Sequence, residues 1–413
     1  QMKSYKCDTT YFTFLVLGLC TLISYFALMG SVAYWKIVYD SIFVTIISVL
    51  FCFSYLCSTI VLIKFNTRFK PEKIITPALC GCFLSLILIV LMYFIPVYAA
   101  RYYLTLLPVA ICGFASGIYF GSIGACAARI SPQMFQATQM GLGLAALFIQ
   151  LVKDVVYAFF QTPPSSANYQ KDQFYTLVVY FSIAVTYIVV CIIVWEAKHK
   201  KLLFLLPILA STSGEVLVSV KNETTNQHEK NQIELSQGQR TRLQILKIVL
   251  PSAISQFFQF FSTYFCYPCL VTTIYLHQFI RLTPGWWATT VITVFFLSDV
   301  VGRIPPKFQK IYKKVPKVAV LWLGYSRLVF IPLYLLLTLP KGAPIIHSDI
   351  ATLIIAILFG FSSGFISTFL FMKYQEDLTK IERVTGSFFV TLFYQISQVV
   401  GGLCGVGLAF AVK

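Results

Sequence analysis

The sequence predicts an all-α integral membrane protein with eleven transmembrane helices. Three observations support this prediction. Of the 413 residues, 58% are apolar and only 11% are charged, whereas a soluble domain has about 25% charged residues. The mean hydropathy is +0.79. Apolar runs longer than about 18 residues, enough to cross a bilayer as a helix, recur along the whole chain. Soluble enzymes, DNA-binding proteins and disordered proteins are therefore excluded as classes.

Windows of membrane-spanning length place six helices before a polar segment and five after it. The segment at 197–245 is polar and becomes charged toward its end, which is typical of a linker. We therefore expect a six-helix bundle at 1–196, a cytoplasmic linker loop at 197–245 and a five-helix bundle at 246–413, a 6+5 arrangement. The expected spans are 11–35, 41–63, 74–97, 104–128, 137–161, 174–196, 246–276, 286–305, 317–339, 349–372 and 384–411.

The positive charge of the chain predicts its orientation. The formal net charge is +17, from 32 Lys and Arg against 15 Asp and Glu. Most of the basic residues fall at the N-terminus and in every second connection, as expected for cytoplasmic loops. We therefore expect a cytoplasmic N-terminus and an extracellular C-terminus, with the plasma membrane as the default location. The charge requires no nucleic-acid partner.

Further predictions concern the linker and the N-terminus. The apolar stretch 202–210 is too short to cross a bilayer, so we expect an interfacial segment, with a loop as the alternative. The sequon Asn222-Glu223-Thr224 faces the cytoplasm on this topology and should be unmodified. No cleavable signal peptide is expected, because the first apolar run is long enough to span. Gln1 before Met2 indicates a chain trimmed from a longer one.

Leaving aside the first and last two positions of each expected span, five charged residues lie within the spans: Lys153, Asp154, Asp299, Arg303 and Arg327. Each would cost at least about 2.5 kcal/mol if it faced lipid at the bilayer centre, so each should face protein or water. Asp299 and Arg303 are four residues apart, on one helix face and in the favourable order for pairing. Two interpretations remain open: a buried ion pair that pins helices, or the polar floor of a cavity. In the second, the pair would bind vicinal hydroxyl groups.

The other intramembrane charges have different expected roles. For Arg327 we expect a structural clamp on backbone carbonyls or a carboxylate, with Pro332 kinking the helix. Lys153 and Asp154 are adjacent and point about 100° apart, so they need partners on other helices. A proton-coupling role for Asp154 is the alternative. Small residues at fourfold spacing predict close helix packing: Gly113, Gly117 and Gly121; Gly360 and Gly364; Gly401 and Gly405.

Two enzyme motifs are missing from the sequence. There are four His residues and no HExxH or P-loop pattern. Cys266 and Cys269 form a lone CxxC in an aromatic run, without a second pair or a nearby His, so a metal site is not expected. We therefore predict no enzymatic activity, no metal and no cofactor. The expected partners are a small-molecule substrate and the lipid bilayer, for a monomeric protein.

Five segments together resemble the motifs of one transporter family. Residues 296–303 read Phe-Leu-Ser-Asp-Val-Val-Gly-Arg, similar to an eighth-span Asn-x-x-Asp-x-x-Gly-Arg signature. Residues 327–333 resemble a ninth-span Arg-x-x-x-x-Pro-Leu motif, and residues 17–22 a first-span Leu-Gly-x-Gly-Thr-Leu. Residues 361–365 are similar to Phe-Ser-Asn-Gly-Tyr, and residues 267–268 to Phe-Pro. The combination resembles the equilibrative nucleoside transporter family.

The resemblance implies a major-facilitator-like carrier that moves nucleosides or nucleobases, purines among them, by alternating access as a facilitative uniporter. The substrate would bind in a central cavity near the bilayer midplane. By motif position, Asp299 and Arg303 would meet ribose hydroxyls. Other expected substrate-binding residues are Leu22, Tyr25 and Met29 on one face of the first span, with Phe120, Tyr267 and Phe296 from three further spans.

Departures from the family pattern predict a divergent specificity. Phe296 replaces the Asn of the eighth-span signature, and Phe120 aligns with a fourth-span Gln that reads the base. The first-span Pro-Trp-Asn is replaced by Ser24-Tyr25-Phe26. A site without these amides would discriminate against substrates that need them. The alternatives are therefore a carrier of a nucleobase or another small organic solute, a proton-coupled nucleoside transporter, and, from another class, a channel or receptor.

Overall fold

The computed structural model describes residues 2–65, 70–159, 168–212, 240–267, 270–271, 274, 276–277, 284–339 and 344–411. These residues form eleven helical segments long and apolar enough to cross a membrane, as predicted. The α-helices are α1 (Met2–Leu19), α2 (Ile23–Gly30), α3 (Val32–Val38), α4 (Ser41–Phe65), α5 (Pro71–Leu91), α6 (Tyr98–Ile130), α7 (Pro132–Phe159), α8 (Tyr169–Thr212), α10 (Arg242–Cys266), α11 (Pro284–Gly302), α12 (Gln309–Lys314), α13 (Lys317–Ser326), α14 (Phe330–Thr338), α15 (Asp349–Lys373) and α16 (Lys380–Ala411). Short 3₁₀ turns occur at Met92–Phe94, Pro305–Lys307 and Arg327–Val329.

The first span is broken, although the sequence predicts one helix over 11–35. Helix α1 ends at Leu19 and α2 begins at Ile23. At the break, the hydroxyl of Thr21 donates to the carbonyl of Gly18 at 2.7 Å, so a side chain competes with the helical backbone bonds. Gly18 lies against the backbone of Thr138 in α7, where a Cβ would clash. The break therefore follows a close backbone contact between α1 and α7.

The sixth span differs from the prediction, and the ninth is irregular near Pro332, which was expected to kink it. Helix α8 continues through Thr212, so the apolar stretch 202–210 is helical and continuous with α8. A loop there is therefore wrong, and the interfacial position of this stretch stays a prediction. The linker between helices is correspondingly shorter, and Asn222 lies outside the described residues. The ninth span contains a 3₁₀ turn at Arg327–Val329 between α13 and α14. Pro332 has no N–H to donate to the carbonyl of Leu328, which accounts for the irregularity.

Glycine faces bring the helices close together, as their spacing predicts. A Cβ on Gly113 or Gly117 of α6 would lie 2.5 or 2.6 Å from the carbonyl oxygens of Phe51 and Tyr55 in α4. Gly360 and Gly364 face the backbone of α11 in the same way, and Gly401 and Gly405 face α10. Because each pair of helices touches through backbone, few substitutions fit at these positions.

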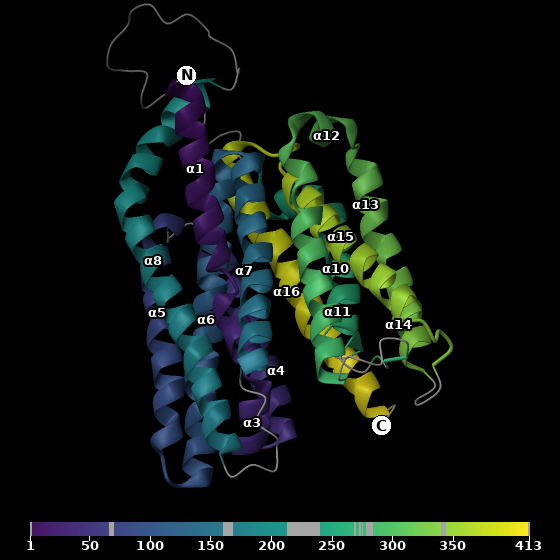
Figure 1. The fold of residues 1–413 in the computed structure, drawn as a ribbon. Helices are drawn as coiled ribbons and strands as arrows, with labels where there is room; N and C mark the ends of the chain where they lie inside the picture. The colour runs from purple at the N-terminus through teal and green to yellow at the C-terminus, as the bar shows by residue number, and fades with distance from the viewer. Residues whose placement is uncertain are drawn as a thin grey trace, which may run out of the picture.

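The helices form one elongated bundle, with the N-terminus and the C-terminus at opposite ends (Figure 1). Helices α1 to α8 lie on one side and α10 to α15 on the other, with α16 between them (Figure 1). Helix α7 packs against both α1 and α11, and α16 packs against α4, α6 and α10. The proposed division into bundles at 1–196 and 246–413 remains a prediction.

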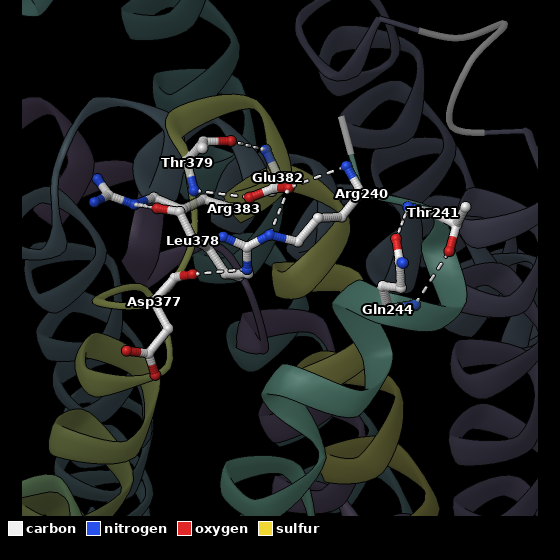
Figure 2. Close-up of polar contacts among 8 residues, drawn as sticks. All are labelled: Arg240, Thr241, Gln244, Asp377, Leu378, Thr379, Glu382 and Arg383. Atoms are coloured by element: carbon white, nitrogen blue, oxygen red, sulfur yellow. Dashed lines mark hydrogen bonds and ion pairs between the residues drawn. The ribbon is translucent and has the colours of Figure 1, made fainter. Parts of the chain in front are cut away.

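Polar contacts fix the starts of α10 and α16 at the end of the bundle that holds the N-terminus. Thr241 and Gln244 form a capping box at the start of α10. Arg240 reaches toward Glu382, with 3.5 Å between Nε and Oε1, and its Nη1 donates to the carbonyl of Asp377 at 3.1 Å (Figure 2). Glu382 also accepts from the backbone N–H of Thr379 at 3.0 Å (Figure 2). These bonds satisfy helix-terminal groups that would otherwise be unpaired.

Candidate functional site

The centre of the bundle contains the paired Asp299 and Arg303. Arg303 Nε donates to Asp299 Oδ2 at 2.7 Å, and both residues are buried, at 5% and 2% exposure. Arg303 Nη1 also donates to the backbone oxygen of Gln139 at 2.9 Å and to its side-chain oxygen at 3.3 Å. The amide of Gln136 donates to the backbone oxygen of Arg303 at 2.9 Å. The pair therefore ties α11 to α7, so the pinning expected for an ion pair is present.

The ion pair retains unused hydrogen-bonding capacity. Only one carboxylate oxygen of Asp299 and two of the three guanidinium nitrogens of Arg303 have partners among the described residues. The remaining groups are Asp299 Oδ1, an acceptor, and Arg303 Nη2, a donor. An acceptor beside a donor can bind two neighbouring hydroxyl groups at once. Pinning two helices and binding a ligand are thus compatible in this pair.

Two glycines leave room for the pair. A Cβ on Gly143 of α7 would lie 2.6 Å from Arg303 Nε and 3.1 Å from Asp299 Oδ2. A Cβ on Gly364 of α15 would clash with the backbone oxygen of Asp299. The helices on both sides therefore approach the pair through backbone atoms, which fixes its position.

Three of the predicted binding residues meet in one aromatic cluster. Phe296 is within 5.8 Å of Phe26 and 5.4 Å of Tyr267, measured between ring centroids. Tyr25 is 5.8 Å from Phe26 and 5.3 Å from Phe51 of α4. The rings come from α2, α4, α11 and Tyr267, the residue that follows α10. These rings form one apolar surface, the aromatic wall, and rings of this kind can stack on flat ligands.

The other predicted binding residues extend this wall. Leu22 is buried at the break between α1 and α2, and Met29 is half-buried in α2. Phe120 is buried, with its ring 6.1 Å from that of Tyr55 and 5.7 Å from that of Tyr394. Tyr394 interacts electrostatically with both Asp299 and Arg303. The aromatic residues and the ion pair therefore lie in one neighbourhood, and their contact with substrate stays a prediction.

Arg327 is arranged as a clamp between helices. It is 1% exposed, and its guanidinium donates to the carbonyl of Phe359 and to the hydroxyls of Ser362 and Thr263, each at 3.0 Å. It also lies 4.7 Å from the centre of the Phe359 ring. These bonds join the ninth span to α10 and α15. The arrangement fits a structural role, since three bonds hold helices together, while Nε has no partner among the described residues.

Asp154 links α7 to α11 at a second point. Its two oxygens accept from Gln150 at 2.8 Å and from the Thr293 hydroxyl of α11 at 2.6 Å. Lys153 is half-buried beside it. The sequence predicted a partner on another helix for Asp154, and Thr293 is that partner.

Sequence reasoning missed the glutamines that surround the pair. Gln136 and Gln139 are fully or almost fully buried in α7, in a span scanned only for charged residues. Gln259 of α10 donates to the carbonyl of Ser363 at 3.3 Å, and Gln395 of α16 is fully buried. A search for uncharged amides at helical spacing, such as Gln256 and Gln259, would have found candidates.

Comparison with known proteins identifies the family. The model of the nucleoside transporter family matches residues 106–413, which is most of the chain. The chain belongs to the nucleoside transporter family. This family member is 21% identical over 297 residues to the equilibrative nucleotide transporter 8 of Arabidopsis thaliana, covering 72% of this chain and 67% of that protein. It is 24% identical over 202 residues to adenosine transporter 1 of Crithidia fasciculata, covering 48% of this chain and only 37% of that protein.

The fold of this nucleoside transporter family member is that of the major facilitator superfamily. The solved structure of the proton:xylose symporter XylE superposes with a TM-score of 0.64 at 12% identity, over 98% of this chain and 95% of that one. At such low identity the likeness concerns the fold alone. Family and fold are both those of membrane transporters, and the chain is a multi-pass membrane protein.

Proposed function

We propose that this chain moves nucleosides or nucleobases down their gradient by alternating access, as a facilitative uniporter without enzymatic activity. The observation that carries the proposal is the buried Asp299–Arg303 pair with one acceptor and one donor unused. Neighbouring hydroxyls of a ribose match this combination. The aromatic wall beside the pair, with Tyr25 and Phe296, provides apolar faces for a base.

Family membership and the names of the relatives support the same substrate class. One relative is named for nucleotides and the other for adenosine. The proposed orientation places the N-terminus in the cytoplasm and the C-terminus outside, in the plasma membrane, because basic residues concentrate at the N-terminus and in every second connection. Substrate would pass through the membrane without any covalent step.

Uptake into proteoliposomes tests the proposal. Purified protein would be assayed with labelled adenosine, uridine and hypoxanthine, and with 2′,3′-dideoxyadenosine, which lacks the neighbouring 2′ and 3′ hydroxyls of the ribose. We expect saturable adenosine and uridine uptake that is stimulated by substrate on the opposite side. Asp299→Asn should weaken adenosine uptake more than dideoxyadenosine or hypoxanthine uptake, since only adenosine offers the hydroxyls. Equal losses for all three in folded protein would show that the pair is structural only.

Asp154 supports one alternative, the proton-coupled nucleoside transporter. Its carboxylate, in α7, accepts a hydrogen bond from Thr293 in α11 and so joins two membrane-spanning helices. Protonation would remove the negative charge from this acceptor and weaken the link, so a proton could act on helix movement. An inward proton gradient that drives adenosine above equilibrium, and fails to do so in Asp154→Asn, would favour this alternative. Equal final levels with and without the gradient support uniport.

A further inference from the structure

Three buried glutamines of the bundle have amide groups without partners. Gln256, Gln395 and Gln398 are 0%, 0% and 3% exposed. Among the described residues, neither the oxygen nor the nitrogen of each side-chain amide has a hydrogen-bond partner. Burying an amide without a partner is unfavourable, and such groups are rare in native proteins. A ligand that pairs with the amides would account for their burial.

Gln395 is next to a second unpartnered group. The phenol of Tyr55 in α4 interacts with the Gln395 amide, but the geometry completes no hydrogen bond for either group with any described residue. Tyr55 is 0% exposed. Together the two side chains offer a donor N–H₂, an acceptor oxygen and a hydroxyl that can act as either. The amide at Gln395 is therefore part of a polar group, contributed by α4 and α16.

Aromatic rings flank this polar group. The ring of Phe120 is 6.1 Å from that of Tyr55 and 5.7 Å from that of Tyr394. On the other side of Tyr394, the ring of Phe260 is 4.4 Å away. Rings around a small set of polar groups are the surroundings expected for a flat heterocycle, which stacks on its faces and forms hydrogen bonds at its edge.

A chain of contacts connects the ion pair with the residue next to Gln395. The backbone of Asp299 touches Gly364 of α15. The adjacent Ser363 accepts from Gln259 of α10, whose neighbour Phe260 packs on Tyr394 of α16. These contacts cross the bundle from α11 through α15 and α10 to α16. Tyr394, next to Gln395, also interacts electrostatically with both Asp299 and Arg303.

We infer that Gln395, with Tyr55, recognises the polar edge of an adenine-type base, while Asp299 and Arg303 bind the sugar. This assignment rests on the proposed function and names its substrate class. A Gln amide pairs with adenine through two bonds, accepting from the 6-amino group and donating to the neighbouring ring nitrogen. A base without an amino group at that edge satisfies only the amide N–H, and the amide oxygen stays unpaired.

The test compares adenosine with purine riboside, which lacks only the 6-amino group. Uptake of both would be measured in proteoliposomes with wild-type protein, Gln395→Leu, Tyr55→Phe and the control Gln375→Leu. The Gln375 amide already donates to the carbonyl of Phe371 at 2.8 Å, near the cytoplasmic end proposed here. Gln395→Leu should fold, because leucine replaces an amide that has no partner, and a thermal midpoint at or above the wild-type value would verify this.

We expect wild-type protein to prefer adenosine by about 10-fold in KM, the usual effect of one hydrogen bond to a buried group. Gln395→Leu should bring this ratio close to one, Tyr55→Phe should reduce it, and Gln375→Leu should leave it unchanged. Wild-type uptake of both nucleosides with the same ratio in Gln395→Leu would overturn the assignment alone. Folded wild-type protein that carries neither would overturn the proposed function as well.

Discussion

A methyl group at Gly143 provides a direct test of how the central ion pair is held. The Cβ of an alanine there would lie 2.6 Å from Arg303 Nε and 2.7 Å from its Cδ. Atoms in ordinary contact are about 3.5 Å apart, so Nε would have to retreat by about 0.9 Å. The bond to Asp299 Oδ2, now 2.7 Å, would then exceed the limit of a hydrogen bond. Gly143→Ala therefore disturbs the pair without removing either charge.

The expected effect on stability follows from two opposing contributions. Loss of a hydrogen bond between charged groups costs about 1.5–3 kcal/mol. Replacing glycine by alanine inside a helix contributes about 1 kcal/mol in the other direction. Gly143→Ala should therefore be about 0.5–2 kcal/mol less stable than wild type. The matched control is Gly402→Ala in α16, where a Cβ meets no atom within 4 Å, and this variant should be as stable as wild type or more so.

Thermal unfolding in detergent and uptake in proteoliposomes would be measured together. Gly143→Ala should have a lower apparent Tm than both wild type and Gly402→Ala. It should also raise the KM for adenosine more than the KM for hypoxanthine, which carries no ribose. An unchanged Tm and an unchanged adenosine KM in Gly143→Ala would refute the reasoning. Such a result would mean that Arg303 can accommodate the methyl group without losing its bond to Asp299.

Three further predictions concern the helix contacts. Gly117→Ala should lower the apparent Tm, because its Cβ would lie 2.6 Å from the Tyr55 carbonyl oxygen and overpack α4 against α6. The expected cost is about 1–3 kcal/mol, and a wild-type Tm would contradict this prediction. Thr293→Val removes the donor to Asp154 and should change the pH dependence of uptake; an unaltered pH profile would argue against any role for this link. Glu382→Ala should cost about 1 kcal/mol in thermal stability, because the backbone N–H of Thr379 loses its acceptor; a control substitution at exposed Asp377 should cost less.

The sequence predicted the number of spans and the glycine contacts because both depend on local properties. Span length follows from bilayer thickness, and fourfold glycine spacing requires only one helix face. The break between α1 and α2 could not be predicted in this way. It depends on Gly18 meeting the backbone of Thr138, a residue on another helix. The extension of α8 through Thr212 likewise concerned a stretch too short to span, which length alone assigned to the linker.

The candidate site shows the same division between local and non-local information. The four-residue spacing of Asp299 and Arg303 predicted their ion pair, which the structure contains. Their bonds to α7 depend on Gln139, which carries no charge and stands out in no sequence pattern. Gln395 was missed because amides were sought at the positions of Phe120 and Phe296. Only the packing of α16 beside α4 brings the Gln395 amide close to the Tyr55 phenol.

Buried polar groups in this bundle divide into two kinds, and the division separates structure from function. Arg327 donates to three partners on two neighbouring helices, with only its Nε unpaired among the described residues, and Asp154 accepts at both oxygens, so the bonds that fix their positions need no ligand. Gln395 and Tyr55 have no completed bond among the described residues, and the central ion pair has partners for only part of its capacity. A group that the protein leaves unpaired in a low-dielectric interior destabilises the empty state and gains most when a matching ligand arrives. A carrier must bind its substrate while its helices stay free to move against each other. Polar groups that are only partly paired within the protein meet this need, because they bind a ligand without bonding the helices firmly together.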